Sequence, residues 1–150
     1  MALTPRGSAV FLDTNVLVYA SFPQSPFHGA ARMRLKTLES DEASFWTSRQ
    51  LLREYLASTT RPGGIVPAPP LASILKAVRQ FEAEFQIADE DAGVTAHLLD
   101  LLESPGPQGR QVLDANIVAT MRRYNIPYLL THNTTDFTRY APDVTVLPLI

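Results

Sequence analysis

A largely apolar run that ends abruptly at an acid restricts the fold of this chain more than any other feature. Ser8 to Leu12 form this run, and Asp13, Thr14 and Asn15 follow it directly. A strand without polar alternation is typical of a parallel sheet that is covered on both faces. Such sheets bind ligands beyond the carboxyl ends of their strands. The sequence therefore predicts a buried strand with Asp13 at the edge where a functional site is expected.

Strand-like and helical segments alternate along the rest of the chain. The further predicted strands cover 44–46, 85–88, 128–131 and 144–149, and helical patterns cover 16–20, 27–38, 47–56, 71–85, 89–102 and 111–124. Stretches rich in proline and glycine at 61–70 and 104–109 predict loops. This alternation predicts an α/β fold with a mostly parallel sheet. We find no repeat and no second composition zone, so residues 1–150 are expected to form one domain.

Composition excludes several chemistries. The chain has no cysteine, which excludes disulfides, thiolate metal sites and a cysteine nucleophile. Its formal net charge is −2, which argues against a protein that holds nucleic acid mainly through a basic surface. An enzyme that meets phosphate through a bound metal ion remains compatible with this charge. No signal peptide or transmembrane segment is recognised, so a cytoplasmic protein with no membrane partner is expected.

Asp114 lies within an apolar helical stripe. Ile117, Val118 and Met121 follow it at the spacings that share one helix face. A carboxylate among them costs free energy unless it is compensated. One interpretation is an acid in the first turn of its helix, stabilised by free backbone N–H groups or by an arginine. The other interpretation, which we favour, is a metal ligand or catalytic acid at the edge of the core.

Asp13 and Asp136 each have an ordinary structural explanation as well. Asp13 can serve as the N-cap of a helix that follows its strand. Asp136 comes a few residues after the predicted strand 128–131, where Asn133 can cap a short helix. Their positions after strands add weight to a functional role, because the carboxyl ends of parallel strands share one edge.

Glu54 is the weakest candidate when it is considered alone. Thr47 and Gln50 are predicted to form a capping box at the start of its helix. Glu54 lies outside the apolar stripe of that helix, so periodicity predicts a glutamate that faces solvent.

Clustered carboxylates repel by roughly 4 kcal/mol per pair at about 4 Å. A hard divalent cation removes that penalty, and oxygen ligands suit Mg²⁺ or Mn²⁺.

Four blocks of the sequence resemble the acidic blocks of PIN domains, and the last two particularly resemble those of VapC-type toxins. The blocks are FLDTN at 11–15, SRQLLREYL around Glu54, LDANIVATM at 113–121 and LLTHNTTDF at 129–137. The resemblance covers nearly the whole chain and implies a three-layer α/β/α fold around a mostly parallel five-stranded sheet. It also implies that one acidic pocket is lined by Asp13, Glu54, Asp114 and Asp136 and supported by Thr14, Asn15 and Asn133.

The same resemblance implies a Mg²⁺-dependent endoribonuclease, with Mn²⁺ as a substitute, that forms a homodimer and is silenced by a cognate antitoxin. We expect Asp13 and Asp114 to bind the principal metal ion and Asp136 to help through a bound water or a second ion. Glu54 would orient or deprotonate the attacking water. Candidates for positioning RNA are Arg49, Arg53, Arg122 and Arg123. A solvated helix face is the more ordinary role for these arginines. The chain departs from its relatives at Leu113 and Asn116, where histidine and a basic residue are common.

Two other enzyme classes fit the sequence poorly. A phosphatase of the haloacid dehalogenase type needs a second acid where Asn15 stands and a suitably placed lysine. A response-regulator receiver domain needs a cluster of paired acids and a lysine after a late strand, and the sequence lacks both. The serious alternative is a non-catalytic PIN-fold module that binds RNA or a protein without cutting. A metal-binding titration separates this alternative from the nuclease.

Overall fold

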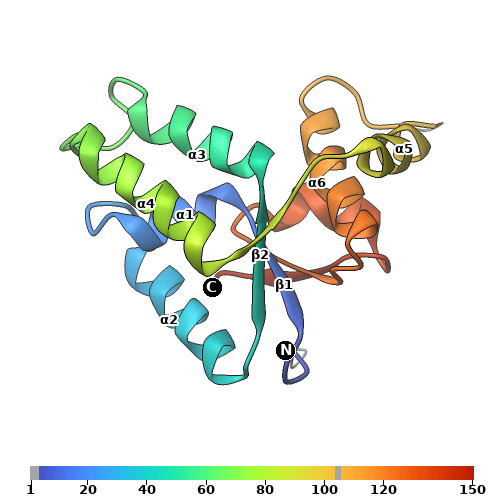
Figure 1. The fold of residues 1–150 in the computed structure, drawn as a ribbon, viewed down its shortest axis with the longest axis horizontal. Coiled ribbons are helices and arrows are strands. Elements are labelled where there is room, and N and C mark those ends of the chain that lie inside the picture. Colours follow the sequence, from blue (N-terminus) through green and yellow to red (C-terminus); the bar gives the residue numbers. More distant parts are fainter. Residues whose placement is uncertain (1–3, 104–105) are drawn as a thin grey trace.

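A central parallel sheet organises the computed structural model, which describes residues 4–103 and 106–150 (Figure 1). The strands are β1 (Ala9–Leu12), β2 (Ser44–Ser48), β3 (Gln86–Ala88), β4 (Tyr128–Thr131) and β5 (Thr145–Pro148). They lie in the order β3-β2-β1-β4-β5, and all four neighbouring pairs are parallel. The expected five-stranded sheet is confirmed, and it is wholly parallel within the described residues.

Helices cover both faces of this sheet. They are α1 (Thr14–Ser21), α2 (His28–Ser40), α3 (Arg49–Thr60), α4 (Leu71–Glu84), α5 (Ala92–Leu101), α6 (Gln111–Arg123) and the 3₁₀ helix η1 (Thr134–Tyr140). Figure 1 shows α1 to α4 on one side of the sheet and α5 and α6 on the other. The expected three-layer α/β/α architecture is thereby confirmed.

The central strand β1 supplies both hydrophobic cores. Val10 and Leu12 pack into a cluster with residues of α1 to α4, whereas Phe11 packs into a second cluster with residues of α6 such as Val118. Successive side chains of a strand point to opposite faces, so an apolar run without alternation is what a strand between two helical layers requires. The sequence of β1 therefore explains why it occupies the centre of the sheet.

The start of α3 differs from the prediction. Ser48 is its N-cap, and its hydroxyl accepts a hydrogen bond from the backbone N–H of Leu51 at 3.4 Å. The predicted capping box of Thr47 and Gln50 is therefore wrong. Thr47 belongs to β2 and donates its hydroxyl to the carbonyl of Leu12 at 3.4 Å. The side chain of Gln50 is free for other contacts.

Other boundaries agree more closely with the prediction. Helix α5 begins at Ala92 rather than at 89, because the Asp91 side chain caps it by accepting from the Val94 N–H at 3.1 Å. Asn125 takes the predicted left-handed conformation after α6, with φ of 55°. The predicted loop 61–70 joins α3 to α4, while residues 104–105 of the predicted loop 104–109 lie outside the described residues.

None of the helices described has the length and apolarity that crossing a membrane demands.

Candidate active site

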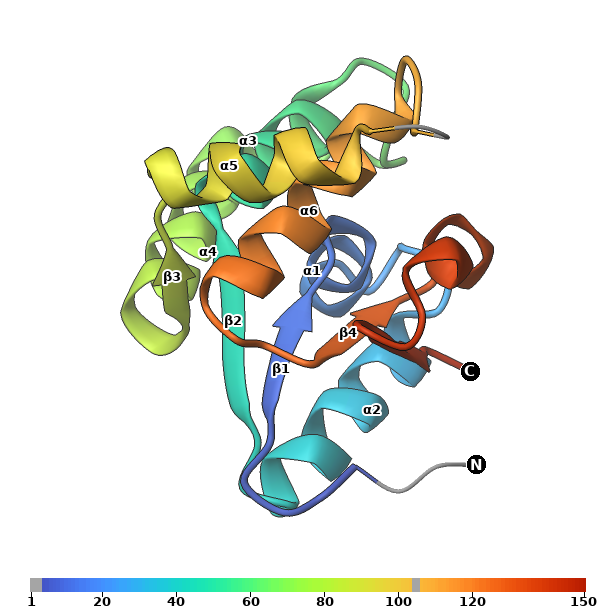
Figure 2. The ribbon, with the colours of Figure 1, turned by 90° about the vertical axis from the view of Figure 1, so that its right-hand side faces the viewer.

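The carboxyl ends of β1 and β4 bring two segments that are distant in the sequence together. These strands are neighbours in the sheet, and Figure 2 shows α1 leading away from the tip of β1. Asp13 follows β1 directly and is the N-cap of α1, while Thr131 is the last residue of β4. Asp13 is therefore the N-cap of a helix, and it also lies at the carboxyl edge of the sheet.

Asp13 is a buried carboxylate, with 7% of its surface exposed. It accepts hydrogen bonds from the Thr131 hydroxyl and from the Thr14 backbone N–H, both at 2.7 Å. The pKa of Asp13 is raised to about 6, chiefly by burial and also by the negative charges of Glu54 and Asp114, while these two hydrogen bonds lower it. An ionised Asp13 is therefore costly in this protein unless a cation accompanies it.

Thr131 connects Asp13 to two of the predicted supporting residues. Its hydroxyl oxygen accepts from the Asn15 amide at 3.3 Å and from the backbone N–H of Asn133 at 3.0 Å. The other end of the Asn15 side chain accepts from the backbone N–H of His132 at 3.1 Å. Thr131 was not predicted as a site residue, although a polar residue at the end of an apolar strand is a signal that could have indicated it. Asn133 contacts Thr131 through its backbone N–H and not through its side chain.

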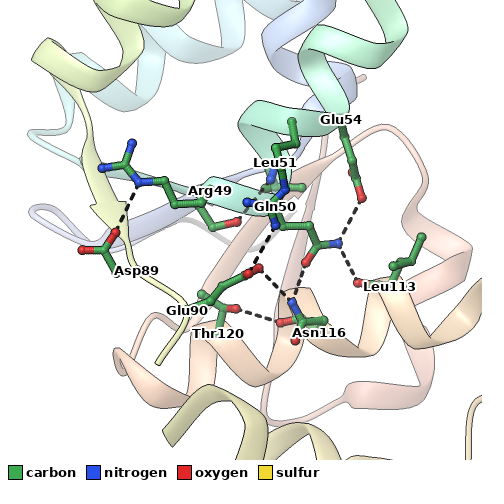
Figure 3. Close-up of polar contacts among 11 residues, drawn as sticks. Arg49, Gln50, Leu51, Glu54, Asp89, Glu90, Leu113, Asn116 and Thr120 are labelled. Atoms are coloured by element: carbon green, nitrogen blue, oxygen red, sulfur yellow. Dashed lines mark hydrogen bonds and ion pairs between the residues drawn. The ribbon is translucent and has the colours of Figure 1, made fainter. Parts of the chain in front are cut away.

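Glu54 is half-buried on α3 and does not face solvent as the helical periodicity predicted. One carboxylate oxygen accepts from the Gln50 amide at 3.0 Å, and the other accepts from the Thr14 hydroxyl at 3.3 Å. The periodicity was misleading because α3 buries two sides. Tyr55 and Leu56 pack into the first core, where Tyr55 stacks on Phe22, and Leu51 packs into the second. Gln50 and Glu54 point toward α6 (Figure 3).

Asp114 occupies the first turn of α6 and is half-buried. Burial is the largest cause that raises its pKa, and the charges of Asp136 and Glu54 raise it further. None of the four acids forms an ion pair with a basic residue in the described part of the chain. The arginine partner that the structural interpretation of Asp114 allowed is therefore not found among these residues.

Asp136 lies in the first turn of η1 and shares a cavity of about 440 Å³ with Asp114. Arg139 is the one basic residue among the described residues that line this cavity. In a 3₁₀ helix, side chains three positions apart project from the same face, which explains why Asp136 and Arg139 line it together. Arg139 was not among the predicted site residues. A larger cavity of about 1140 Å³, between α2 and the end of α4, contains none of the four acids.

The four acids are electrostatic neighbours. Glu54 and Asp114 act on Asp13, and Asp136 and Glu54 act on Asp114. Even so, the residues described offer no group of three or more acidic or histidine side chains that could hold a metal ion as they stand. The site is therefore an open cluster of carboxylates rather than a closed set of ligands.

The four arginines that were considered for RNA contacts all have acidic partners. Arg49 pairs with Glu82 and Asp89, Arg53 with Glu90, Arg122 with Asp143 and Arg123 with Asp91. These pairs lie at the surface, where an ion pair contributes little stability and can exchange for another anion. A role for these arginines in binding RNA stays a prediction.

A family model described as the PIN domain matches residues 10–142, a range that contains all four acids. The chain belongs to the PIN-domain family. A search of curated proteins finds no match. The comparison with individual proteins therefore rests on solved structures.

Three solved structures illustrate this likeness. VapBC2 from Rickettsia felis, bound to a DNA fragment from their promoter, is 20% identical with a TM-score of 0.69, covering 93% of this chain and 98% of that chain. VapC20 from Mycobacterium tuberculosis, described as a Sarcin-Ricin loop cleaving toxin, is 20% identical with a TM-score of 0.59, covering 80% and 86%. A toxin–antitoxin complex from Klebsiella pneumoniae is 22% identical with a TM-score of 0.64, covering 95% and 98%. At these identities the likeness establishes the fold.

Proposed function

We propose that this PIN-domain protein is a metal-dependent endoribonuclease. The observation that carries the proposal is a cluster of carboxylates at the carboxyl edge of the sheet, none of which forms an ion pair with a basic residue among the described residues. Asp13 and Asp114 have raised pKa values, and the charge of Glu54 acts on both. Such an arrangement lowers the stability of the metal-free fold, and groups of this kind gather where chemistry is performed.

The donor chemistry of the site fits Mg²⁺, with Mn²⁺ as a substitute. Its donors are carboxylate oxygens, which these hard cations prefer, and Asp13 is buried without a cationic partner among the described residues. We assign Asp13, Asp114 and Asp136 as the residues that would hold the ion. When bound, such an ion lowers the pKa of water and stabilises negative charge on a phosphoryl group.

The side chains around this site have distinct parts in the hydrolysis of a phosphodiester. Glu54, held at both oxygens, would orient the attacking water and accept its proton while the water oxygen bonds to phosphorus and the opposite P–O bond breaks. Thr131 would hold Asp13 in place. Arg139, beside Asp136, would donate to the phosphate oxygens of the RNA. Because water is the nucleophile, the reaction requires no serine, cysteine or histidine.

We further propose that the protein is the toxin of a type II toxin–antitoxin pair, acting as a homodimer in the cytoplasm with RNA as substrate and an antitoxin protein as partner. The described toxin–antitoxin complexes of this fold support the antitoxin partner. A small reading frame directly upstream should encode the antitoxin. Expression of this chain alone should arrest growth, and co-expression of that reading frame should restore it. Growth that is unaffected by expression of folded protein would remove the toxin assignment.

The alternative function is a PIN-fold module that binds RNA or a protein without cutting. It is favoured by the open arrangement of the acids, which form no ready-made metal group among the described residues. A titration of the purified protein with Mn²⁺, followed by calorimetry, separates the two functions. The nuclease predicts saturable binding that weakens in Asp114→Asn. Equal, non-saturating heats for parent and variant would favour the non-catalytic module.

A further inference from the structure

One buried amide links the helix that carries Glu54 to the helix that carries Asp114. Gln50, in the first turn of α3, has 6% of its surface exposed. Its amide nitrogen donates to Glu54 at 3.0 Å and to the backbone carbonyl of Leu113 at 3.1 Å, and its oxygen accepts from the Asn116 amide at 2.7 Å. Figure 3 shows this side chain reaching from α3 to the first turn of α6. Both of its donor hydrogens and its acceptor are used.

The three contacts of Gln50 have unequal chemical consequences. The Leu113 carbonyl belongs to the peptide group that leads into Asp114, so one amide hydrogen of Gln50 binds α6 next to that acid. The other amide hydrogen binds the Glu54 carboxylate, and hydrogen bonds to a charged acceptor are the stronger kind. Within the described residues, every side-chain hydrogen bond between α3 and α6 involves Gln50. Among these hydrogen bonds, those of Gln50 alone join the Glu54 carboxylate to α6.

Glu54 has little else to hold it. Its second oxygen accepts from the Thr14 hydroxyl at 3.3 Å, a long hydrogen bond that Thr14 shares with the backbone carbonyl of Leu51 at 3.2 Å. Without Gln50, the half-buried carboxylate would keep this one contact and regain rotamer freedom. Water activation requires the base within hydrogen-bond reach of the attacking water, so freedom at this position lowers the rate.

We propose that Gln50 is a positioning residue that holds the Glu54 carboxylate in register with the first turn of α6. The inference rests on the proposed nuclease function, because the rate through Glu54 is what Gln50 would control. Asn116 completes the bridge at its outer end, where it also donates to Glu90 at 3.1 Å. Asn116 does not touch Glu54, so its loss should weaken the bridge and leave the carboxylate held.

A double-mutant cycle on RNA cleavage tests this role. Gln50→Met keeps the size of the side chain without its hydrogen bonds and should lower kcat about tenfold or more, with KM close to that of the parent. Its buried partners are left unpaired, so its Tm should fall, and kcat is measured well below that Tm. In a Glu54→Gln background, Gln50→Met should cause no further loss of kcat, because the group through which it acts is already gone. Equal losses of kcat in both backgrounds would show that Gln50 supports the fold alone and would overturn the proposal.

Two further variants keep the test decisive. Gln50→Glu retains the size and the acceptor for Asn116 but removes the donor to Glu54, so it should lose as much kcat as Gln50→Met. Gln80→Met, at an exposed position of α4, is the matched control and should stay within about threefold of the parent. If Gln50→Glu keeps the parental kcat, or if Gln80→Met loses as much as Gln50→Met, the proposal is wrong. A folded parent that cuts no RNA would instead defeat the proposed function, and this inference with it.

Discussion

At the scale of single residues, Asp13 joins structure to chemistry. It caps α1 and ties β1 to β4 through Thr131, yet it is buried beside two other carboxylates. Its hydrogen bonds favour the ionised form and its burial disfavours it, and burial has the larger effect. The metal-free protein therefore carries a cost at this position that a bound cation would relieve.

Replacing Asp13 by asparagine should remove a pH-dependent cost from the metal-free protein. The folded state raises the pKa of Asp13 from 3.8 to about 6, so its protonated form favours folding. The stability that this protonation contributes is fully present below the unfolded-state pKa and is lost as the pH rises through the folded-state pKa. Above both pKa values, the ionised Asp13 lowers the free energy of unfolding by up to about 3 kcal/mol. Asparagine has one acceptor oxygen where Asp13 uses two, which costs the variant stability at every pH. Thermal melts in EDTA should therefore show the Tm of the variant rising relative to that of the parent as the pH goes from ~4 to neutral. A difference in Tm that does not change with pH would contradict the assigned cost.

Thr131 should matter to both the fold and the activity. Thr131→Val removes the hydroxyl that donates to Asp13 and accepts from Asn15, so we expect a loss of about 1–3 kcal/mol in the free energy of unfolding. Cleavage should fall at least about tenfold, because Asp13 loses its anchor. Thr59→Val is the matched control. Among the described residues, its buried hydroxyl bonds only the backbone carbonyls of α3, so the kcat of this variant should stay near the parental value.

At the scale of elements, η1 places a cation next to an acid. Arg139 lines the same cavity as Asp114 and Asp136. Arg139→Ala should raise the KM for RNA about tenfold with a smaller change in kcat, and it should lower the salt slope of binding by about 0.7. Arg139→Lys should recover part of the affinity. Arg79→Ala, on α4 away from that cavity, controls for the lost charge, and an equal effect of both alanine variants would refute a specific role for Arg139.

The elements also show where sequence reasoning succeeds. Asp13 and Asp114 can be found from local features, because the end of an apolar strand and the inward face of a helix are visible in a single segment. The position of Glu54 depends on packing between α3 and α6, which no single helical pattern contains. The resemblance to PIN domains supplied Glu54, whereas Gln50, Thr131 and Arg139 emerged only from the contacts between elements.

At the scale of the whole molecule, the alternation of strands and helices predicts the α/β class, and the resemblance supplies the three layers. The strand order β3-β2-β1-β4-β5 does not follow from segment patterns, because each strand is short and apolar and could pair with any other. That order decides the site, since it places β1 beside β4 and so Asp13 beside Thr131. The central claim about the molecule is that this edge of the sheet cuts RNA.

The most direct test is cleavage of a pool of structured RNAs by the purified protein with Mg²⁺ or Mn²⁺, with EDTA, and beside Asp114→Asn. We expect cuts that require the metal ion and disappear in Asp114→Asn, whose Tm in EDTA should equal or exceed the parent's because the raised pKa of Asp114 marks a costly charge. Cuts that persist at the parental rate in Asp114→Asn, or a folded, antitoxin-free protein that cuts nothing, would contradict this account.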